Sequence, residues 1–281
     1  ASDGELSPGE VVQLAVDTGL KALAITDHDT LGGLNEAENK AKELGLVLIK
    51  GIEINTDGPG KEVHILGLGL DEKNDRLHRR LLELREKRLL RMREILEKLA
   101  KLGVEISCEE VLKNAQGDSV GRPHIARAIV KYGFAGSFQE AFENYLKIGA
   151  PAYVPRKKLT PVLAIQIIRE SGGVAVVAHP GSQISEAEIK QWMFEGLQGI
   201  EVSHPDHTPR QVTAYRDMAK RLNLIATGGS DFHGTGIKPH IQLGYWGTGL
   251  NTLSLLERAK EKAQENIVKV DKENAIVTES S

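Results

Sequence analysis

Cysteine is nearly absent from this 281-residue sequence, which contains only Cys108. An internal disulfide and a zinc site built from cysteines are both excluded, and a reducing compartment, by default the cytoplasm, is expected. Aromatic residues make up only 4% of the chain, which argues against a stacking platform for single-stranded nucleic acid without excluding RNA binding. No apolar run approaches the roughly 20 residues that a membrane span requires, so no membrane association is expected.

Neither sign of charge predominates, because 36 basic residues face 39 acidic ones and the formal net charge is −3. Hydrophobic residues make up 40% of the chain, which is ample for a core. The composition is that of an ordinary globular protein. We expect one large domain, or one domain with an insertion, and no obligate protein partner.

Strand and helix patterns alternate in the first seventy residues. Expected strands over 22–26, 46–54 and 63–70 alternate with a helix opened by the capping box at Ser7 and a helix over 31–44. Turn residues precede the third strand, which is expected to pair with the second as a hairpin.

The alternation of strand and helix patterns then stops. Residues 74–102 predict one long amphipathic helix, and no strand pattern follows before residue 155. Alternation resumes with expected strands over 174–178, 199–203 and 224–227. Strands separated by helices predict a parallel sheet, closed as a barrel or open. We therefore expect an α/β domain formed by residues 1–72 and 155–265, an all-helical insertion or cap at 73–154, and a C-terminal tail at 266–281.

Histidines and acids fall where the expected strands end. These residues are Asp27, His28, Asp29, Glu53, His179, Glu201, His204, Asp231 and His233. The carboxyl ends of parallel strands meet at one face of a sheet, so these side chains are expected to gather at one rim. His64, in the hairpin strand beside Glu53, can reach the same rim.

Each of these histidines alone is more simply explained as a solvated or core residue. Together, however, carboxylates and imidazoles at one rim would repel or lose hydration unless a cation neutralised them. Nitrogen and oxygen ligands without thiolate suit zinc, manganese or iron better than calcium, and such ions acidify bound water. The pattern predicts a metal-assisted hydrolase.

The same residues form an ordered set of motifs. They are Ser2-Asp3-Gly4, Thr26-Asp27-His28-Asp29, Gly51-Ile52-Glu53-Ile54, His64, Ala178-His179-Pro180-Gly181 and Gly229-Ser230-Asp231-Phe232-His233. This set resembles the polymerase and histidinol phosphatase (PHP) phosphoesterases. Gly121-Arg122-Pro123-His124 and the segment 201–208 are similar to the branch that hydrolyses 3′,5′-nucleoside bisphosphates and trims short RNA from its 5′ end.

The resemblance implies a distorted seven-stranded, TIM-like (β/α)7 barrel with three divalent metal ions, most often Mn²⁺, with Zn²⁺ or Fe²⁺ as alternatives. In the ligand set it implies, Asp3, His28 and His233 hold one metal, and Glu53 bridges the other two. Of these two, one is completed by His64 and His179, and the other is served by Asp231. The family's first motif, a strand ending in Asp-x-His-x-His before Ser-Asp-Gly, is not in the sequence, which begins at Ala1. We expect that motif and the first barrel strand to precede Ala1 in the natural protein.

Candidate phosphate ligands lie in and after the insertion. Arg122 opens an expected helix, so that its guanidinium and free backbone N–H groups point the same way, although a surface ion pair is the simpler alternative. His124, Lys157 and His207 are further candidates for substrate or phosphate contact. The arginines of the long helix are expected mostly to form a solvated face, because glutamates are interleaved with them.

The main hypothesis is a metal-dependent phosphohydrolase acting on a nucleoside bisphosphate or short RNA. Asp231 would serve the metals, and His204 or a metal-held water would assist the leaving alkoxide. One alternative is another phosphatase of the family, acting on histidinol phosphate or a cyclic sugar phosphate. Another is a metal-binding module without turnover, if the Asp-x-His-x-His motif is truly absent.

Overall fold

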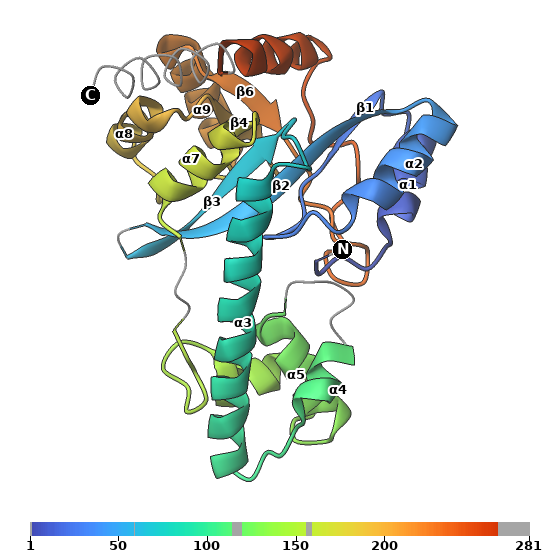
Figure 1. Ribbon diagram of the computed structural model, residues 1–281, viewed down its shortest axis with the longest axis vertical. Helices are drawn as coiled ribbons and strands as arrows, with labels where there is room; N and C mark the ends of the chain where they lie inside the picture. Colours follow the sequence, from blue (N-terminus) through green and yellow to red (C-terminus); the bar gives the residue numbers. More distant parts are fainter. Residues whose placement is uncertain (1, 59, 114–119, 156–158, 264–281) are drawn as a thin grey trace, which may run out of the picture.

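Six strands form one curled sheet in the computed structural model, which describes residues 2–58, 60–113, 120–155 and 159–263 (Figure 1). The strands are β1 (Ala22–Ile25), β2 (Val47–Gly58), β3 (Lys61–Leu68), β4 (Val174–Val177), β5 (Gly199–Ser203) and β6 (Ile225–Gly228). They lie side by side in chain order from β1 to β6. The expected α/β fold is confirmed, whereas a seventh strand is not seen among the described residues.

The sheet is mixed rather than wholly parallel. β1 with β2, β4 with β5, and β5 with β6 are parallel pairs. β2 and β3 form the expected antiparallel hairpin, in which Ile54 pairs with Ile65. β3 also pairs antiparallel with β4, so the expectation of a parallel sheet is wrong at this junction. The hairpin reverses the chain direction, and the long connection to β4 reverses it again.

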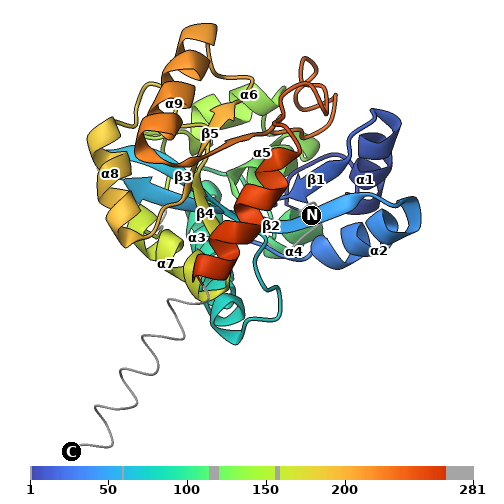
Figure 2. The same cartoon turned by 90° about the horizontal axis from the view of Figure 1, so that it is seen from above.

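Helices cover the outer side of the sheet. The two helices α1 (Pro8–Asp17) and α2 (Leu34–Leu44) pack on β1 through Val12, Ala37 and Ile25. The helices α7 (Pro161–Glu170), α8 (Glu186–Glu195) and α9 (Pro209–Leu222) cover β2 to β6 at the other end, as Figure 2 shows. A final helical stretch, 251–263, packs Leu256 against Leu66 and Leu68 on the opposite face of the sheet.

A long helix carries the chain away from the sheet between β3 and β4. It is α3 (Asp75–Lys101), followed by α4 (Cys108–Lys113), α5 (Arg122–Lys131), α6 (Phe138–Ala141) and the π-helix η1 (Phe142–Leu146) (Figure 1). These helices share a hydrophobic cluster of their own, centred on Leu99, Ile125, Ile129 and Leu146, each at most 1% exposed. The N-terminal part of α3 packs against the main core through the buried Leu77.

The curl of the sheet leaves a cavity of about 500 Å³ between its two edge strands, β1 and β6. Leucines of β1, β3 and the last helical stretch line its apolar part, and the expected metal ligands other than His64 line one end. None of the helices that the structure describes is both long and apolar enough to cross a membrane. The expected tail at 266–281 and Lys157 lie outside the described residues.

Candidate metal centre

Within the part of the chain that the structure describes, four non-glycine residues have positive φ, and three of them lie just after strands at the candidate site. They are Asp29 (φ 54°), His179 (φ 21°) and Asp231 (φ 50°). The fourth, Asn223, only ends helix α9. Such conformations cost of order 1–3 kcal/mol each, so the surrounding contacts must hold them in place. The local strain is concentrated where the sequence places its candidate ligands.

Glu53 on β2 lies at the centre of a row of imidazoles. Its Oε1 is 2.7 Å from His64 Nδ1 and 3.1 Å from His179 Nε2, and its Oε2 is 3.7 Å from His28 Nδ1. The rings of His64 and His179 have their centroids 5.0 Å apart, and the row continues from His179 to His204 at 5.0 Å. His28, Glu53 and His64 each offer an atom within 4.8 Å of the other two, as a metal ion requires.

A second group with suitable spacing is formed by Asp3, His28 and His233. Asp3 Oδ1 lies 3.4 Å from His233 Nε2. The N-terminal segment is held there because the backbone N–H of Ser2 donates to Asp27 Oδ1 at 2.7 Å, and the Ser2 hydroxyl accepts from the backbone N–H of His28. Asp3 in the N-terminal segment, His28 after β1 and His233 after β6 thus meet at one point of the rim.

The electrostatics of both groups reflect closely packed acids and imidazoles. Burial opposes charge on His64, but its hydrogen bonds to Glu53 and Glu62 raise its pKa to about 9. Burial likewise opposes charge on His233, but Asp3 raises its pKa to about 9. Although burial acts against it, the charge of His28 and hydrogen bonds from His179 and His64 hold the pKa of Glu53 well below its usual range.

This donor set fits divalent metal ions. Protons on the imidazoles provide the positive charge that the buried carboxylates need, and a metal ion would provide the same charge while taking neutral imidazoles as ligands. Glu53 is 6% exposed and has three imidazoles around its two oxygens, which suits a carboxylate shared between ions. The bridging role of Glu53, the grouping of ligands and the number of ions stay predictions.

Asp231 stands slightly apart from both groups. Its carboxylate pairs with Lys238 and lies 3.4 Å from His233 Nδ1 and 4.0 Å from His204 Nε2. It therefore adjoins the Asp3 group through His233, and its expected role as a metal ligand stays a prediction.

His204 presents an unpaired nitrogen to this end of the cavity. It is 1% exposed, and its Nδ1 accepts a hydrogen bond of 3.1 Å from the backbone N–H of Asp206. In the neutral ring the proton is therefore on Nε2, which is buried and has no hydrogen-bond partner among the described residues. Burial, helped by the nearby charge of His179, lowers the pKa of His204 to about 4.

His207 lies behind His204 rather than beside the metal ligands. Its ring is between those of His204 and Tyr215, at centroid distances of 5.5 and 5.1 Å. Its Nδ1 bonds to the carbonyl oxygen of Val202 at 2.9 Å. The expected contact of His207 with substrate stays a prediction, and the ring geometry suits a support for His204.

Two residues at the site have partners that the sequence does not predict. The sequence places Glu201 only as an acid at the end of a strand. In the structure it is 5% exposed, its Oε2 accepts from the backbone N–H of His179 at 2.7 Å, and burial raises its pKa to about 8. The sequence predicts a solvated face for Arg88 and its neighbours, yet Arg88 reaches from α3 to form an ion pair with Asp29. Its Nε is buried without a partner in the described structure.

The other candidates from the insertion lie at different depths. His124 is 3% exposed, and its Nδ1 accepts from the backbone N–H of Gly121 at 3.0 Å. Arg122 donates to the carbonyl oxygen of Leu146 at 3.1 Å, and its guanidinium lies 5.6 Å from the Tyr153 ring centroid. Arg122 thus has a hydrogen-bond partner inside the insertion, and its expected binding of phosphate stays a prediction.

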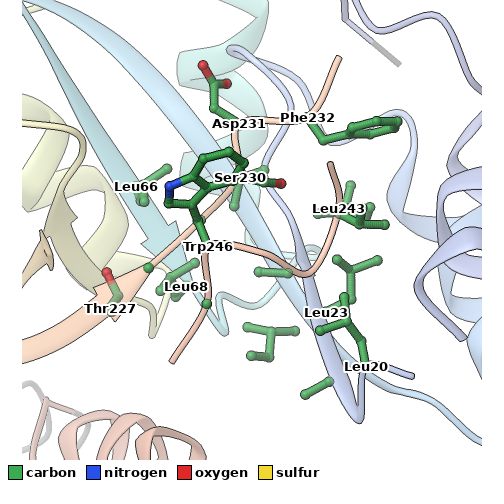
Figure 3. A pocket seen from close by; sticks show the side chains of 18 of the residues that line it. Leu20, Leu23, Leu66, Leu68, Thr227, Ser230, Asp231, Phe232, Leu243 and Trp246 are labelled. Atoms are coloured by element: carbon green, nitrogen blue, oxygen red, sulfur yellow. The ribbon is translucent and has the colours of Figure 1, made fainter. Parts of the chain in front are cut away.

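Figure 3 shows the cavity from close by, with Asp231 at one end and Leu20, Leu23, Leu66 and Leu68 on its apolar walls. The polar end, which carries the candidate metal ligands, and the apolar interior are therefore continuous. The arrangement provides a cluster of ligands for divalent ions, a buried imidazole N–H beside them, and an arginine from the insertion close to the same rim.

Comparisons with known proteins agree with this geometry. The family model described as the PHP domain matches residues 1–153. A 5′-3′ exoribonuclease of Haemophilus influenzae is 37% identical over 244 residues, which cover 83% of this chain and 86% of that protein. A 3′,5′-nucleoside bisphosphate phosphatase of Chromobacterium violaceum is 34% identical over 241 residues, covering 84% and 85%.

Among solved structures, a protein of Bifidobacterium adolescentis described as a metal-dependent phosphoesterase superposes with a TM-score of 0.82 at 31% identity, covering 92% of both chains. With the matched family model and relatives above 30% identity over most of its length, the chain belongs to the PHP domain family.

Proposed function

We propose that this protein is a metal-dependent phosphoesterase that removes phosphate from 3′,5′-nucleoside bisphosphates and trims short RNA from its 5′ end. The observation that carries the proposal is Glu53, a buried carboxylate surrounded by His28, His64 and His179 at the carboxyl ends of neighbouring strands. The substrate class is supported by the two named relatives, which are a nucleoside bisphosphate phosphatase and a 5′-3′ exoribonuclease.

The metal-binding residues are assigned as the sequence resemblance implies. Asp3, His28 and His233 would hold one ion, Glu53, His64 and His179 would hold a second, and Glu53 with Asp231 would serve a third. When bound, divalent ions such as Mn²⁺ would acidify a water molecule and neutralise charge on the phosphoryl group. The spacing of the donors supports this assignment. Asp3, His28 and His233 each offer an atom within 4.8 Å of the other two. In the second group, Glu53 Oε1 lies 2.7 Å from His64 Nδ1 and 3.1 Å from His179 Nε2.

The protein's own residues would orient the reacting phosphate and its leaving oxygen. His204 holds an N–H at Nε2, fixed by the bond from Asp206 to Nδ1, and this N–H would donate to an oxygen of the phosphoryl group or leaving group. A donor that is buried and needs no reorientation contributes more in the transition state than one exposed to water. His207 would keep the His204 ring in place.

Residues of the insertion would select substrates that carry a second phosphate. Arg88 is near the rim through its ion pair with Asp29, and His124 is buried close enough to Asp3 for that charge to act on its pKa. Arg122 and Lys157 would add positive charge nearby. A bisphosphate or a 5′-phosphorylated RNA end would satisfy both the metal rim and these cations, whereas a simple monoester would satisfy only the rim.

The finer architecture is also part of the proposal. A seventh strand between β1 and β6 would pair with two edges that have no strand partner there in the described structure, and it would fill the apolar cavity. Ending in Asp-x-His-x-His, it would bring further ligands to Glu53 and Asp231. The helical insertion at 73–154 would then form a cap over one barrel. A cytoplasmic location is proposed as well, because a chain with a single cysteine has no internal disulfide that would need an oxidising compartment.

The direct test is hydrolysis of adenosine 3′,5′-bisphosphate, and of a short 5′-phosphorylated RNA, by the purified protein with Mn²⁺. Release of phosphate from the bisphosphate and of nucleoside monophosphates from the RNA, both abolished by EDTA, would support the proposal. Full hydrolysis by metal-free protein would refute the metal requirement. Activity on histidinol phosphate but not on the bisphosphate would refute the substrate class.

The matched variants are His179→Ala and His78→Ala. His179 is at the rim beside Glu53, whereas His78 is exposed on α3. Elemental analysis after purification without chelator should therefore show a loss of metal in the first variant only. Equal metal contents in the two variants would mean that the ligand assignment is wrong.

A further inference from the structure

Glu201 occupies a buried position between two loops that carry candidate metal ligands. It is the third residue of β5 and is 5% exposed. One carboxylate oxygen, Oε2, accepts a hydrogen bond of 2.7 Å from the backbone N–H of His179. The bond is to the main chain of His179, so it acts on the conformation of the loop and leaves the imidazole free to reach Glu53.

The His179 loop requires such a support. With φ at 21°, His179 has a backbone conformation that L-residues other than glycine rarely adopt, and it is followed by Pro180 and by Gly181 with φ 55°. Two contacts hold this turn: the bond from His179 N–H to Glu201, and a bond from the Tyr215 hydroxyl to the carbonyl oxygen of Gly181. The turn directs His179 Nε2 to within 3.1 Å of Glu53 Oε1.

The other oxygen of Glu201 faces the loop that follows β6. A Cβ atom added at Gly229 would lie only 2.7 Å from Glu201 Oε1, so glycine at this position makes room for the carboxylate. This loop leads directly to Asp231, which has positive φ, and to His233. The pairing of β5 with β6 also becomes irregular between Glu201 and Ser203. The Glu201 carboxylate therefore binds the His179 loop through Oε2 and lies against the loop after β6 at Gly229.

We propose that Glu201 is a positioning residue, which fixes the His179 turn through its backbone N–H and thereby sets the affinity of the rim for divalent metal. The inference rests on the proposed metal-binding function and adds to it a residue that is not among the expected ligands. Groups that orient metal ligands commonly change metal affinity by 10–100-fold when they are removed. The acceptor oxygen, rather than the negative charge, is the property that this role requires.

Two substitutions separate the acceptor from the charge. Glu201→Gln keeps an oxygen that can accept from His179 N–H, whereas Glu201→Leu keeps only the approximate volume. Binding of Mn²⁺ to each protein, measured by titration calorimetry after removal of metal, should be within about threefold of the unaltered protein for Gln and at least tenfold weaker for Leu. If Gln weakens binding as much as Leu, or if neither weakens it, the proposal is refuted.

A second pair of variants keeps the test decisive if Glu201→Leu does not fold. Gly229→Ala pushes directly on the Glu201 carboxylate, whereas Gly247→Ala adds a methyl group where no atom lies within 4 Å. Weaker Mn²⁺ binding in Gly229→Ala alone would support the positioning role, and equal binding in both would refute it. Because the readout is metal binding, a protein that binds Mn²⁺ but does not hydrolyse a bisphosphate would count against the proposed function and not against this inference.

Discussion

Lowering the pH should destabilise the metal-free protein through His204. Its ring is 1% exposed, and burial lowers its pKa to about 4, against a usual value near 6.5 for a solvated histidine. Because the folded state disfavours the proton, the stability due to this residue is fully present above pH 6.5 and is lost as the pH falls toward 4. The charged or titratable groups around it are His179, His207, Asp206 and Asp231.

The size of the effect follows from the two pKa values. At pH 5 an unfolded histidine is almost fully protonated and the folded one is mostly neutral, so the free energy of unfolding should fall by about 2 kcal/mol relative to pH 7. At still lower pH, the full decrease in the free energy of unfolding due to His204 would be about 3 kcal/mol. Other groups also titrate in this range, so the contribution of His204 must be measured as a difference between two proteins.

The assay is urea unfolding in EDTA at pH 7 and pH 5, for the unaltered protein and for His204→Asn. The amide oxygen of asparagine can accept from the Asp206 backbone N–H but takes no proton in this range. The stability difference between the two proteins should therefore shrink by about 2 kcal/mol between pH 7 and pH 5. The control His78→Asn alters an exposed ring. If the difference for His204→Asn is the same at both pH values, the reasoning is wrong.

Three further outcomes are expected. Arg122→Ala should lower kcat/KM for a bisphosphate by an amount that corresponds to about 1.5–3 kcal/mol of lost transition-state stabilisation, and should lower kcat/KM for a monoester much less. Equal losses for the two substrates would indicate that Arg122 acts only through its bond to Leu146. Arg88→Met should lower the free energy of unfolding, measured in urea, by about 3 kcal/mol, because it removes the guanidinium that pairs with the buried Asp29 carboxylate; a change below about 0.5 kcal/mol would contradict this. A chain extended ahead of Ala1 by a strand ending in His-x-His should bind more metal and melt at a higher temperature, and an unchanged metal content and melting temperature would refute the proposed seventh strand.

The metal rim could be predicted from the sequence because it depends on a simple geometric rule. Five of the six expected strands end at or close to a candidate acid or histidine, and strands that run in the same direction end at the same face. The structure brings Glu53, His64 and His179 within hydrogen-bonding distance, and family membership is confirmed. Glu53 and His64 meet because the hairpin register places His64 opposite Asn55, close to Glu53 on the neighbouring strand.

Other features could not be predicted because periodicity gives neither strand direction nor the orientation of a helix. The antiparallel pairing of β3 with β4 depends on where the chain re-enters the sheet after the insertion, which no local pattern specifies. The partial burial of Arg88, by contrast, could have been predicted, because Arg88 is four residues from both Leu84 and Met92 and therefore on the buried face of α3. Only its ion pair with Asp29 depends on tertiary packing. His207 is close to His204 in sequence, but its ring turns toward Tyr215.

The pairing of β3 with β4 has a consequence for how the chain folds. Leu68 pairs with Val174, and the chain between them, roughly a hundred residues long, contains the whole helical insertion. Closing so long a loop costs more entropy than forming the adjacent β2–β3 hairpin, so this step should be slow and late. The insertion has its own hydrophobic cluster, and its early collapse would bring Leu68 and Val174 closer together. A substitution that loosens that cluster, far from the rim, should therefore slow the refolding of the sheet that carries the metal ligands.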